Sequence, residues 1–136
     1  MQVLIHCSAS SWGNAVEIDK WHRDRGFDMI GYHYVILNGF IDAKQIYSKI
    51  ADGLIETGRR QNKKGAHTRG HNNKVGICLI GNPGEFTQSQ YDALNWLLQK
   101  LQEETPMYET FDVEEHSDVD PKKPYCASID WNKINF

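Results

Sequence analysis

The chain has 136 residues, with 15 lysines and arginines against 18 aspartates and glutamates, a formal net charge of −3 and 40% hydrophobic residues. This composition excludes a disordered, collagen-like or coiled-coil protein, and the acidic balance gives no general support for binding nucleic acid. A chain of this length fits one compact domain around one core, so we predict a single domain spanning residues 1–136.

Two further features bear on where the protein works. No apolar run approaches the ~20 residues that a membrane span needs. The start, MQVLIHCSAS, lacks a basic segment followed by a long apolar stretch, so we expect synthesis in the cytoplasm without a signal peptide. The three cysteines, Cys7, Cys78 and Cys126, are few and odd in number, which argues against a disulfide framework and favours free thiols or metal ligation.

The first half of the chain predicts three strands and one helix. Residues 2–9 form a short apolar run ending in small polar residues, which is typical of a buried strand. Residues 14–26 open with asparagine, a good N-cap, and stop at glycine, which predicts a helix. Residues 32–39 predict a second strand and residues 53–60 a third, at a sheet edge. The stretch 40–51 between them fits either a helical turn or an inserted loop.

The second half contains the clearest elements. Residues 61–74 form a polar, glycine-punctuated loop, long enough to suggest a functional role. Residues 74–81 predict a buried strand, and residues 87–104 predict a helix with a Thr-x-x-Gln capping box and a leucine-rich face. A short strand at 111–114 and a short helix at 128–134 complete the order β-α-β-β-β-α-β-α. This order predicts an α/β or α+β domain with one mixed sheet covered by helices.

The stretch HSDVDPKKPYC at residues 116–126 places possible metal ligands in a proline-bounded loop. Zinc favours histidine nitrogen and cysteine sulfur, and catalytic zinc sites use three protein ligands and one water. His116 and Cys126 could form a close pair, with His6 as the distant third ligand. A ten-residue gap is weaker evidence than C-x-x-C, so a solvated loop with Cys126 buried stays open. Core roles for His6 and Cys78 stay open as well.

Several stretches, taken in order, resemble a known family. They are LIHCSAS, GYHYVI, GLIETGR, GAHTRGHNNKVGICLIG and EHSDVDPKKPYC, and together they cover nearly the whole chain. The set resembles the type-2 N-acetylmuramoyl-L-alanine amidases, the superfamily of phage amidase lysozymes and animal peptidoglycan recognition proteins. The resemblance implies an α/β fold in which a central mixed β-sheet is flanked by helices and a zinc ion lies in a surface groove. It also implies hydrolysis of the amide between N-acetylmuramic acid and the L-alanine of the stem peptide in bacterial peptidoglycan.

The resemblance extends to individual residues. His6, His116 and Cys126 match the family's zinc ligands, and Tyr32 in GYH matches the active-site tyrosine of the phage-like branch. Where another branch carries a glutamate in a strand, this chain has Cys78, so it follows the phage-like pattern.

One position departs from the family pattern. The family's catalytic lysine lies two residues before the third ligand, where this chain has Pro124. The neighbouring lysines are Lys122 and Lys123, and we expect Lys123 to take the role.

The resemblance and general chemistry together predict a mechanism. A zinc-bound water would attack the lactyl carbonyl, zinc and Lys123 would stabilise the oxyanion, and Tyr32 would position the water or assist proton transfer to the leaving amine. We expect His67 to line the groove and contact substrate, with Asn72 and Arg69 as further candidates.

Two other functions stay open. Some members of the superfamily bind peptidoglycan without cutting it, typically after losing the cysteine ligand, and Cys126 is present here. A structural zinc or metal-free interaction domain would not need Tyr32, His67 and the lysine pair around one site. We expect a monomeric enzyme whose partner is peptidoglycan and which reaches the cell wall after release, as in phage lysis, or acts in the host cell. The 40–51 insertion would shape the groove rim.

Overall fold

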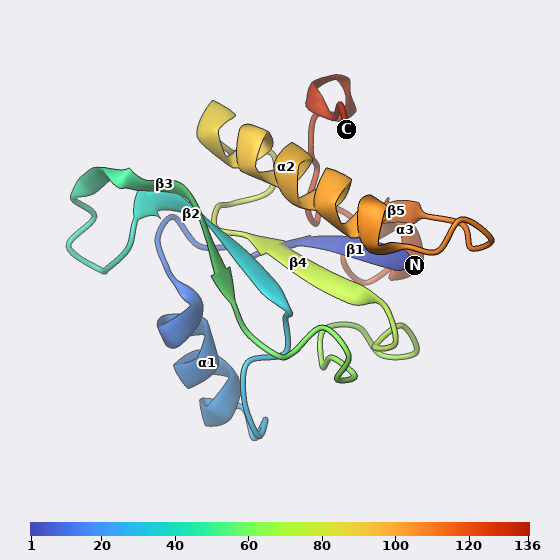
Figure 1. The fold of residues 1–136 in the computed structure, drawn as a ribbon. Coiled ribbons are helices and arrows are strands. Elements are labelled where there is room, and N and C mark those ends of the chain that lie inside the picture. Colours follow the sequence, from blue (N-terminus) through green and yellow to red (C-terminus); the bar gives the residue numbers. More distant parts are fainter.

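The computed structural model describes residues 1–136 and is built on one five-stranded sheet with the order β3-β2-β4-β1-β5 (Figure 1). Neighbouring strands are parallel except for β2 and β3, which are antiparallel. The mixed sheet predicted from the element order is therefore confirmed. The strands are β1 (Gln2–Cys7), β2 (Tyr34–Phe40), β3 (Tyr47–Thr57), β4 (Val75–Leu79) and β5 (Asp112–Glu115).

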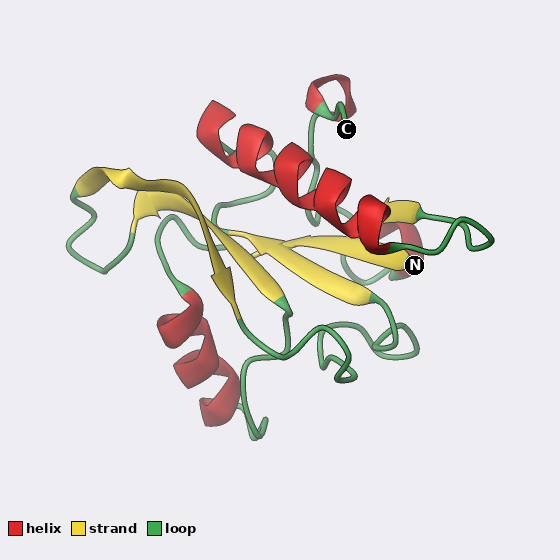
Figure 2. Ribbon diagram, viewed as in Figure 1, coloured by secondary structure: helices red, strands yellow, loops and turns green.

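Helices lie on both faces of this sheet (Figure 2). Helix α1 (Ala15–Asp24) covers part of one face, and helix α2 (Gln88–Glu104) lies along the other. A four-residue helix, α3 (His116–Val119), follows β5 directly, and one 3-10 turn, η1 (Trp131–Lys133), lies near the C-terminus. None of these helices is long and apolar enough to cross a bilayer.

Helix α2 anchors the larger part of the core. Its leucines pack with inward-facing residues of β1, β2 and β4 in a cluster of 15 buried residues. The predicted capping box is present, since the Thr87 side chain accepts from the Gln90 backbone and the Gln90 side chain accepts from the Thr87 backbone. The Gln90 amide, fully buried, also donates to the carbonyls of Ile36 and Ile80 and so ties the helix start to β2 and to the end of β4.

Helix α1 packs over a smaller core. Asn14 caps it by accepting from the Glu17 backbone N–H, as its sequence predicts. Ile18 belongs to a cluster of seven buried residues that includes Val35 and Cys78. Because α1 covers only this part of the face, the neighbouring surface of β1 is left for the site described below.

The structure corrects three of the expected elements. The stretch 40–51 is neither a helical turn nor only a loop, because β3 begins at Tyr47 and runs for 11 residues. The predicted helix at 128–134 is reduced to the turn Trp131–Lys133. Helix α3 was not predicted from the sequence; Glu115 and Asp118 form a local capping box that starts it. The edge position expected for the third strand is confirmed.

Candidate active site

The site forms where two parallel neighbouring strands end. Strands β1 and β5 lie side by side, so their carboxyl ends reach the same edge of the sheet. His6 is the penultimate residue of β1, and His116 follows β5 directly, which brings them together across 110 positions of sequence. The loop after α3 returns Cys126 to the same place, because the Ser117 N–H donates to the Cys126 carbonyl. One ligand atom from each of His6, His116 and Cys126 lies within 4.8 Å of the others.

Hydrogen bonds around this group determine which ring nitrogen carries the proton in His6 and in His116. The Lys74 carbonyl accepts from His67 Nε2 at 2.9 Å, so His67 Nδ1 is bare and accepts from His6 Nε2 at 3.0 Å. His6 Nδ1 therefore carries a lone pair. On the other side, the Asp120 carboxylate accepts from His116 Nε2 at 3.2 Å, which leaves His116 Nδ1 bare as well.

Two unprotonated nitrogens consequently face each other. His6 Nδ1 and His116 Nδ1 are 3.1 Å apart, and His6 is 1% exposed. Two buried lone pairs at this distance repel unless a cation lies against both of them. Two nitrogens bound to one tetrahedral zinc ion are ~3.3 Å apart, given zinc–nitrogen distances of about 2.0–2.1 Å. The arrangement therefore fits a metal ion, with the carbonyl and carboxylate behind the rings acting as outer hydrogen-bond partners.

Burial keeps these imidazoles neutral. Desolvation, followed by the neighbouring histidines, holds the pKa of His6 well below its usual value. Desolvation also lowers the pKa of His116, against the opposing effect of Asp120. Desolvation lowers the pKa of His67 to about 4. All three rings are therefore ready to act as neutral ligands or acceptors at neutral pH.

A second cysteine lies beside Cys126. The Cys7 backbone N–H donates to Cys126 Sγ at 3.1 Å, and the two sulfurs are 3.5 Å apart. Their hydrogen bond lowers the pKa of Cys7 to about 7 and raises that of Cys126. The two thiols titrate as a pair, so the value near 7 belongs to the first proton lost by the pair. A thiolate is thus accessible at neutral pH next to the two bare nitrogens.

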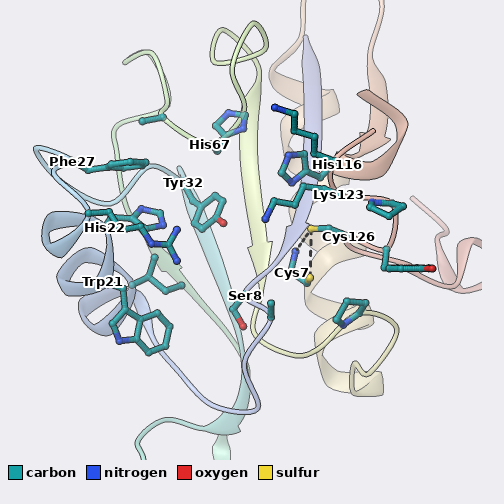
Figure 3. A pocket seen from close by; sticks show the side chains of 18 residues that line it. Cys7, Ser8, Trp21, His22, Phe27, Tyr32, His67, His116, Lys123 and Cys126 are labelled. Atoms are coloured by element: carbon teal, nitrogen blue, oxygen red, sulfur yellow. Dashed lines mark hydrogen bonds between the residues drawn. The ribbon is translucent and has the colours of Figure 1, made fainter. Parts of the chain in front are cut away.

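A cavity of about 390 Å³ opens over this group (Figure 3). Trp21, His22 and Phe27 line one wall, and His116, Lys123 and Cys126 line the other, with Tyr32 and His67 between them. Tyr32 and Lys123 project toward one another across the cavity. Lys122 also lines it, whereas His6 lies beneath it.

Tyr32 stands at the centre of the aromatic groups. Its ring centroid is 5.0 Å from that of His6 and 5.3 Å from that of His22. Burial raises the pKa of Tyr32 well above its usual value, so its hydroxyl keeps its proton and can donate a hydrogen bond into the cavity.

The three residues expected to contact substrate have different places. His67 lines the cavity and contacts His6, a relation that sequence spacing did not suggest. The Asn72 side-chain oxygen accepts from the backbone N–H groups of His67 and Thr68, so it shapes the loop. Arg69 is exposed and lies outside the cavity lining.

Other site residues were missed by the sequence analysis. Cys7 was noted only as a free thiol or a possible metal ligand, and Trp21 and His22 were not singled out. Trp21 and His22 reach the cavity because α1 packs over β2 and β4, and His22 Nδ1 accepts from the Gly31 N–H just before Tyr32. The end signals of α1 predicted a helix but could not show that part of the helix borders a cavity.

Comparison with known proteins gives a consistent result. A family profile described as N-acetylmuramoyl-L-alanine amidase matches residues 2–127. The endolysin of Enterobacteria phage K11 is 35% identical over 140 residues, covering 95% of this chain and 81% of that endolysin. The N-acetylmuramoyl-L-alanine amidase LysC from Clostridium intestinale superposes with a TM-score of 0.78 at 27% identity, over 98% of this chain and 80% of LysC.

A recognition protein shares the fold as well. Bumblebee PGRP-SA superposes with a TM-score of 0.72 at 28% identity, over 90% of this chain and 72% of that one. The family profile spans nearly the whole sequence and includes His6, His116 and Cys126. The chain therefore belongs to the N-acetylmuramoyl-L-alanine amidase family.

Proposed function

We propose that the amidase is zinc-dependent and that His6, His116 and Cys126 hold the ion. The observation that carries this proposal is the pair of bare, buried nitrogens 3.1 Å apart, with the Cys126 sulfur within 4.8 Å of them. Histidine nitrogen and thiolate are the donor types that zinc prefers over harder cations. Zinc bound there would supply a Lewis acid that polarises the lactyl carbonyl and activates water at neutral pH.

Lys123 is proposed as the donor that stabilises the oxyanion. It enters the cavity from the loop that also carries Cys126, and its charge adds to burial in lowering the pKa of His116. An ammonium in a partly enclosed cavity can hydrogen-bond the carbonyl oxygen as negative charge develops on it. Lys122 lines the same cavity and is the alternative for this role.

Tyr32 is proposed to position the attacking water and to assist transfer of a proton to the leaving L-alanine amine. Its hydroxyl is protonated at neutral pH and projects into the cavity opposite Lys123. A donor held between the ligand group and the opposite wall can bridge the attacking and leaving groups of the amide.

His67 is proposed to act first on His6 and second on substrate. By accepting from His6 Nε2 and donating to the Lys74 carbonyl, it fixes the ring whose other nitrogen faces the metal position. Asn72 holds His67 in place because its side-chain oxygen accepts from the His67 backbone N–H. Arg69 is exposed on the same loop and would contact only a longer glycan or peptide.

A non-catalytic recognition module is the second candidate function, since PGRP-SA shares the fold. The complete His-His-Cys group favours the enzyme, because binding alone does not require two bare nitrogens beside a thiol. We further propose that the chain works as a monomer and acts on the cell wall after release in phage lysis, as its similarity to phage endolysins suggests.

The test is digestion of purified peptidoglycan with chelator, with zinc restored, and without either. We expect new free L-alanine amino groups without new reducing sugar ends, loss of this activity with chelator and recovery with zinc. Binding to peptidoglycan with no new amines, in zinc-loaded protein, would instead identify a recognition module.

A further inference from the structure

The cavity has an unusual charge for this protein. Acidic residues outnumber basic ones in the chain, 18 to 15. No aspartate or glutamate lines the cavity, however, while Arg25, Lys122 and Lys123 all do. The cavity is therefore a positively charged site on a protein of net charge −3. Because the cavity walls exclude part of the solvent, these charges favour an anionic ligand more strongly than they would on a flat surface.

Arg25 is a cavity cation that has no proposed role in the reaction and no acidic partner. Arg23, two residues earlier, is paired with Asp19 at 2.7 Å, and the buried Arg59 is paired with Asp28 at 2.8 Å. Arg25 is exposed and makes no ion pair with the chain. Its five guanidinium donors are thus available to a ligand, and a guanidinium is well matched to the two oxygens of a carboxylate.

Arg25 and Lys123 belong to opposite walls. Arg25 caps the C-terminal end of α1, and after burial its charge is the next effect that lowers the pKa of the adjacent His22. Lys123 lies beside His116 on the other wall. A substrate whose reacting carbonyl is held near Lys123 and the ligand group would therefore present a more distant part of its peptide to Arg25.

We infer that Arg25 binds a free carboxylate on the residue that follows L-alanine in the stem peptide, and so selects acidic over amidated peptidoglycan. This inference rests on the proposed function. An extended peptide advances about 3.5 Å per residue, so a carboxylate on the second residue lies on the order of 7 Å from the scissile amide. Of the three cavity cations, Arg25 at the end of α1 is the one that does not belong to the loop carrying Cys126.

The experiment compares two tripeptide ligands, N-acetylmuramoyl-L-alanyl-γ-D-glutamyl-L-lysine, whose second residue has a free α-carboxylate, and the same compound with that α-carboxylate amidated. The γ-carboxyl is bound to lysine in both, so the two ligands differ only in the charge on the second residue. The zinc-loaded enzyme is assayed for kcat/KM by release of amine and for affinity by calorimetry. We expect about a tenfold preference for the acid, as one charge-assisted hydrogen bond provides, and a weaker preference at high salt. Arg25→Gln should lose the preference through a higher KM for the acid. Arg23→Gln, whose parent residue is paired with Asp19, should retain it.

Equal use and equal binding of the two ligands by the unmodified enzyme would overturn the inference, as would a preference that persists in Arg25→Gln. A preference seen only when the third residue carries the carboxylate would overturn the assignment to the second. Peptidoglycan digestion by the same preparation reports separately on the proposed function. If neither ligand is hydrolysed, the ratio of the two calorimetric affinities still decides whether Arg25 recognises the carboxylate.

Discussion

At the scale of single residues, the site depends on hydrogen bonds to the far sides of the two histidines proposed as metal ligands. A backbone carbonyl, that of Lys74, sets the tautomer of His67, which in turn sets the tautomer of His6. The Asp120 carboxylate does the same for His116. Each ligand nitrogen is thus prepared before a metal arrives, which lowers the reorganisation needed for binding.

The cysteine ligand can be tested against the other buried cysteines. Cys126→Ala should lower zinc affinity by more than about 100-fold, because loss of an outer partner alone typically costs 10–100-fold. Cys78→Ala is the matched control, since Cys78 is fully buried in β4 and belongs to the α1-side core. Metal content after dialysis measures both variants. Full zinc content in Cys126→Ala would remove Cys126 from the ligand set.

The two cavity lysines can be separated in the same way. Lys123→Ala should lower kcat by on the order of 10²–10³, the effect of losing one oxyanion donor. Lys122→Ala should lower it less, and both variants should unfold at the denaturant concentration of the parent because both side chains are exposed. An inactive Lys122→Ala beside a fully active Lys123→Ala would transfer the role to Lys122.

At the scale of elements, a glycine in β4 makes room for the ring of His67, which hydrogen-bonds His6. A Cβ placed on Gly76 would lie 2.7 Å from Cδ2 of His67, so the ring packs directly on the strand backbone. The Gly76 N–H also donates to His33 Nδ1 at 2.9 Å, which fixes the local strand position. The loop and the strand therefore fit only because residue 76 has no side chain.

Gly76→Ala should destabilise the protein by about 1–3 kcal/mol, the usual cost of overpacking, and should weaken zinc binding by displacing His67. In a His67→Ala background the same substitution should cost much less, because the clash partner is gone. Urea unfolding of the two single variants and the double variant measures this coupling. Equal costs in both backgrounds would show that the ring is not the obstacle.

The sequence predicted those elements whose signals are local. Helix α2 carries its capping box and leucine face within 18 residues, and β1 and β4 are continuous apolar runs. The start of β3 was missed because this edge strand pairs only with β2 and most of its residues are exposed or half-buried, so residues 47–52 carry no apolar pattern.

The site was less predictable from the residues themselves. His6 and His116 meet only because β1 and β5 pair in parallel, which is a non-local event. The ligand types suggested the grouping of His6, His116 and Cys126, but the ten-residue gap to Cys126 left zinc open until the family resemblance supported it. The contact of His67 with His6 and the place of Arg25 depend on loop and helix packing, which no local pattern encodes.

At the scale of the whole molecule, buried histidines couple stability to pH. Burial lowers the pKa of both His22 and His67 from the ordinary value of 6.5 to about 4. Between these values the unfolded chain takes up protons that the folded chain excludes, so acid favours unfolding. Above about pH 6.5 both states are unprotonated at these groups and the effect vanishes.

The free energy of unfolding of chelator-treated protein should therefore fall as the pH drops from 6.5 toward 4. Urea unfolding at constant ionic strength measures it, with metal release removed from the comparison. His22→Gln should give a shallower decline, because one of the buried titrating groups is gone and glutamine can still accept from the Gly31 N–H. A free energy that is constant or rises on acidification would contradict this account.

The unequal cores on the two faces of the sheet have a consequence for motion. Fifteen buried residues cluster beneath α2 but only seven beneath α1, and α1 forms one wall of the cavity. Local unfolding is easiest where fewest apolar contacts must break. The amides of α1 should accordingly exchange with deuterium sooner than those of α2, and a bound peptidoglycan fragment should slow the exchange of α1 more than that of α2. The cavity would then open to its polymeric substrate by movement of α1, while β1 and β5, which carry His6 and lead into His116, stay fixed.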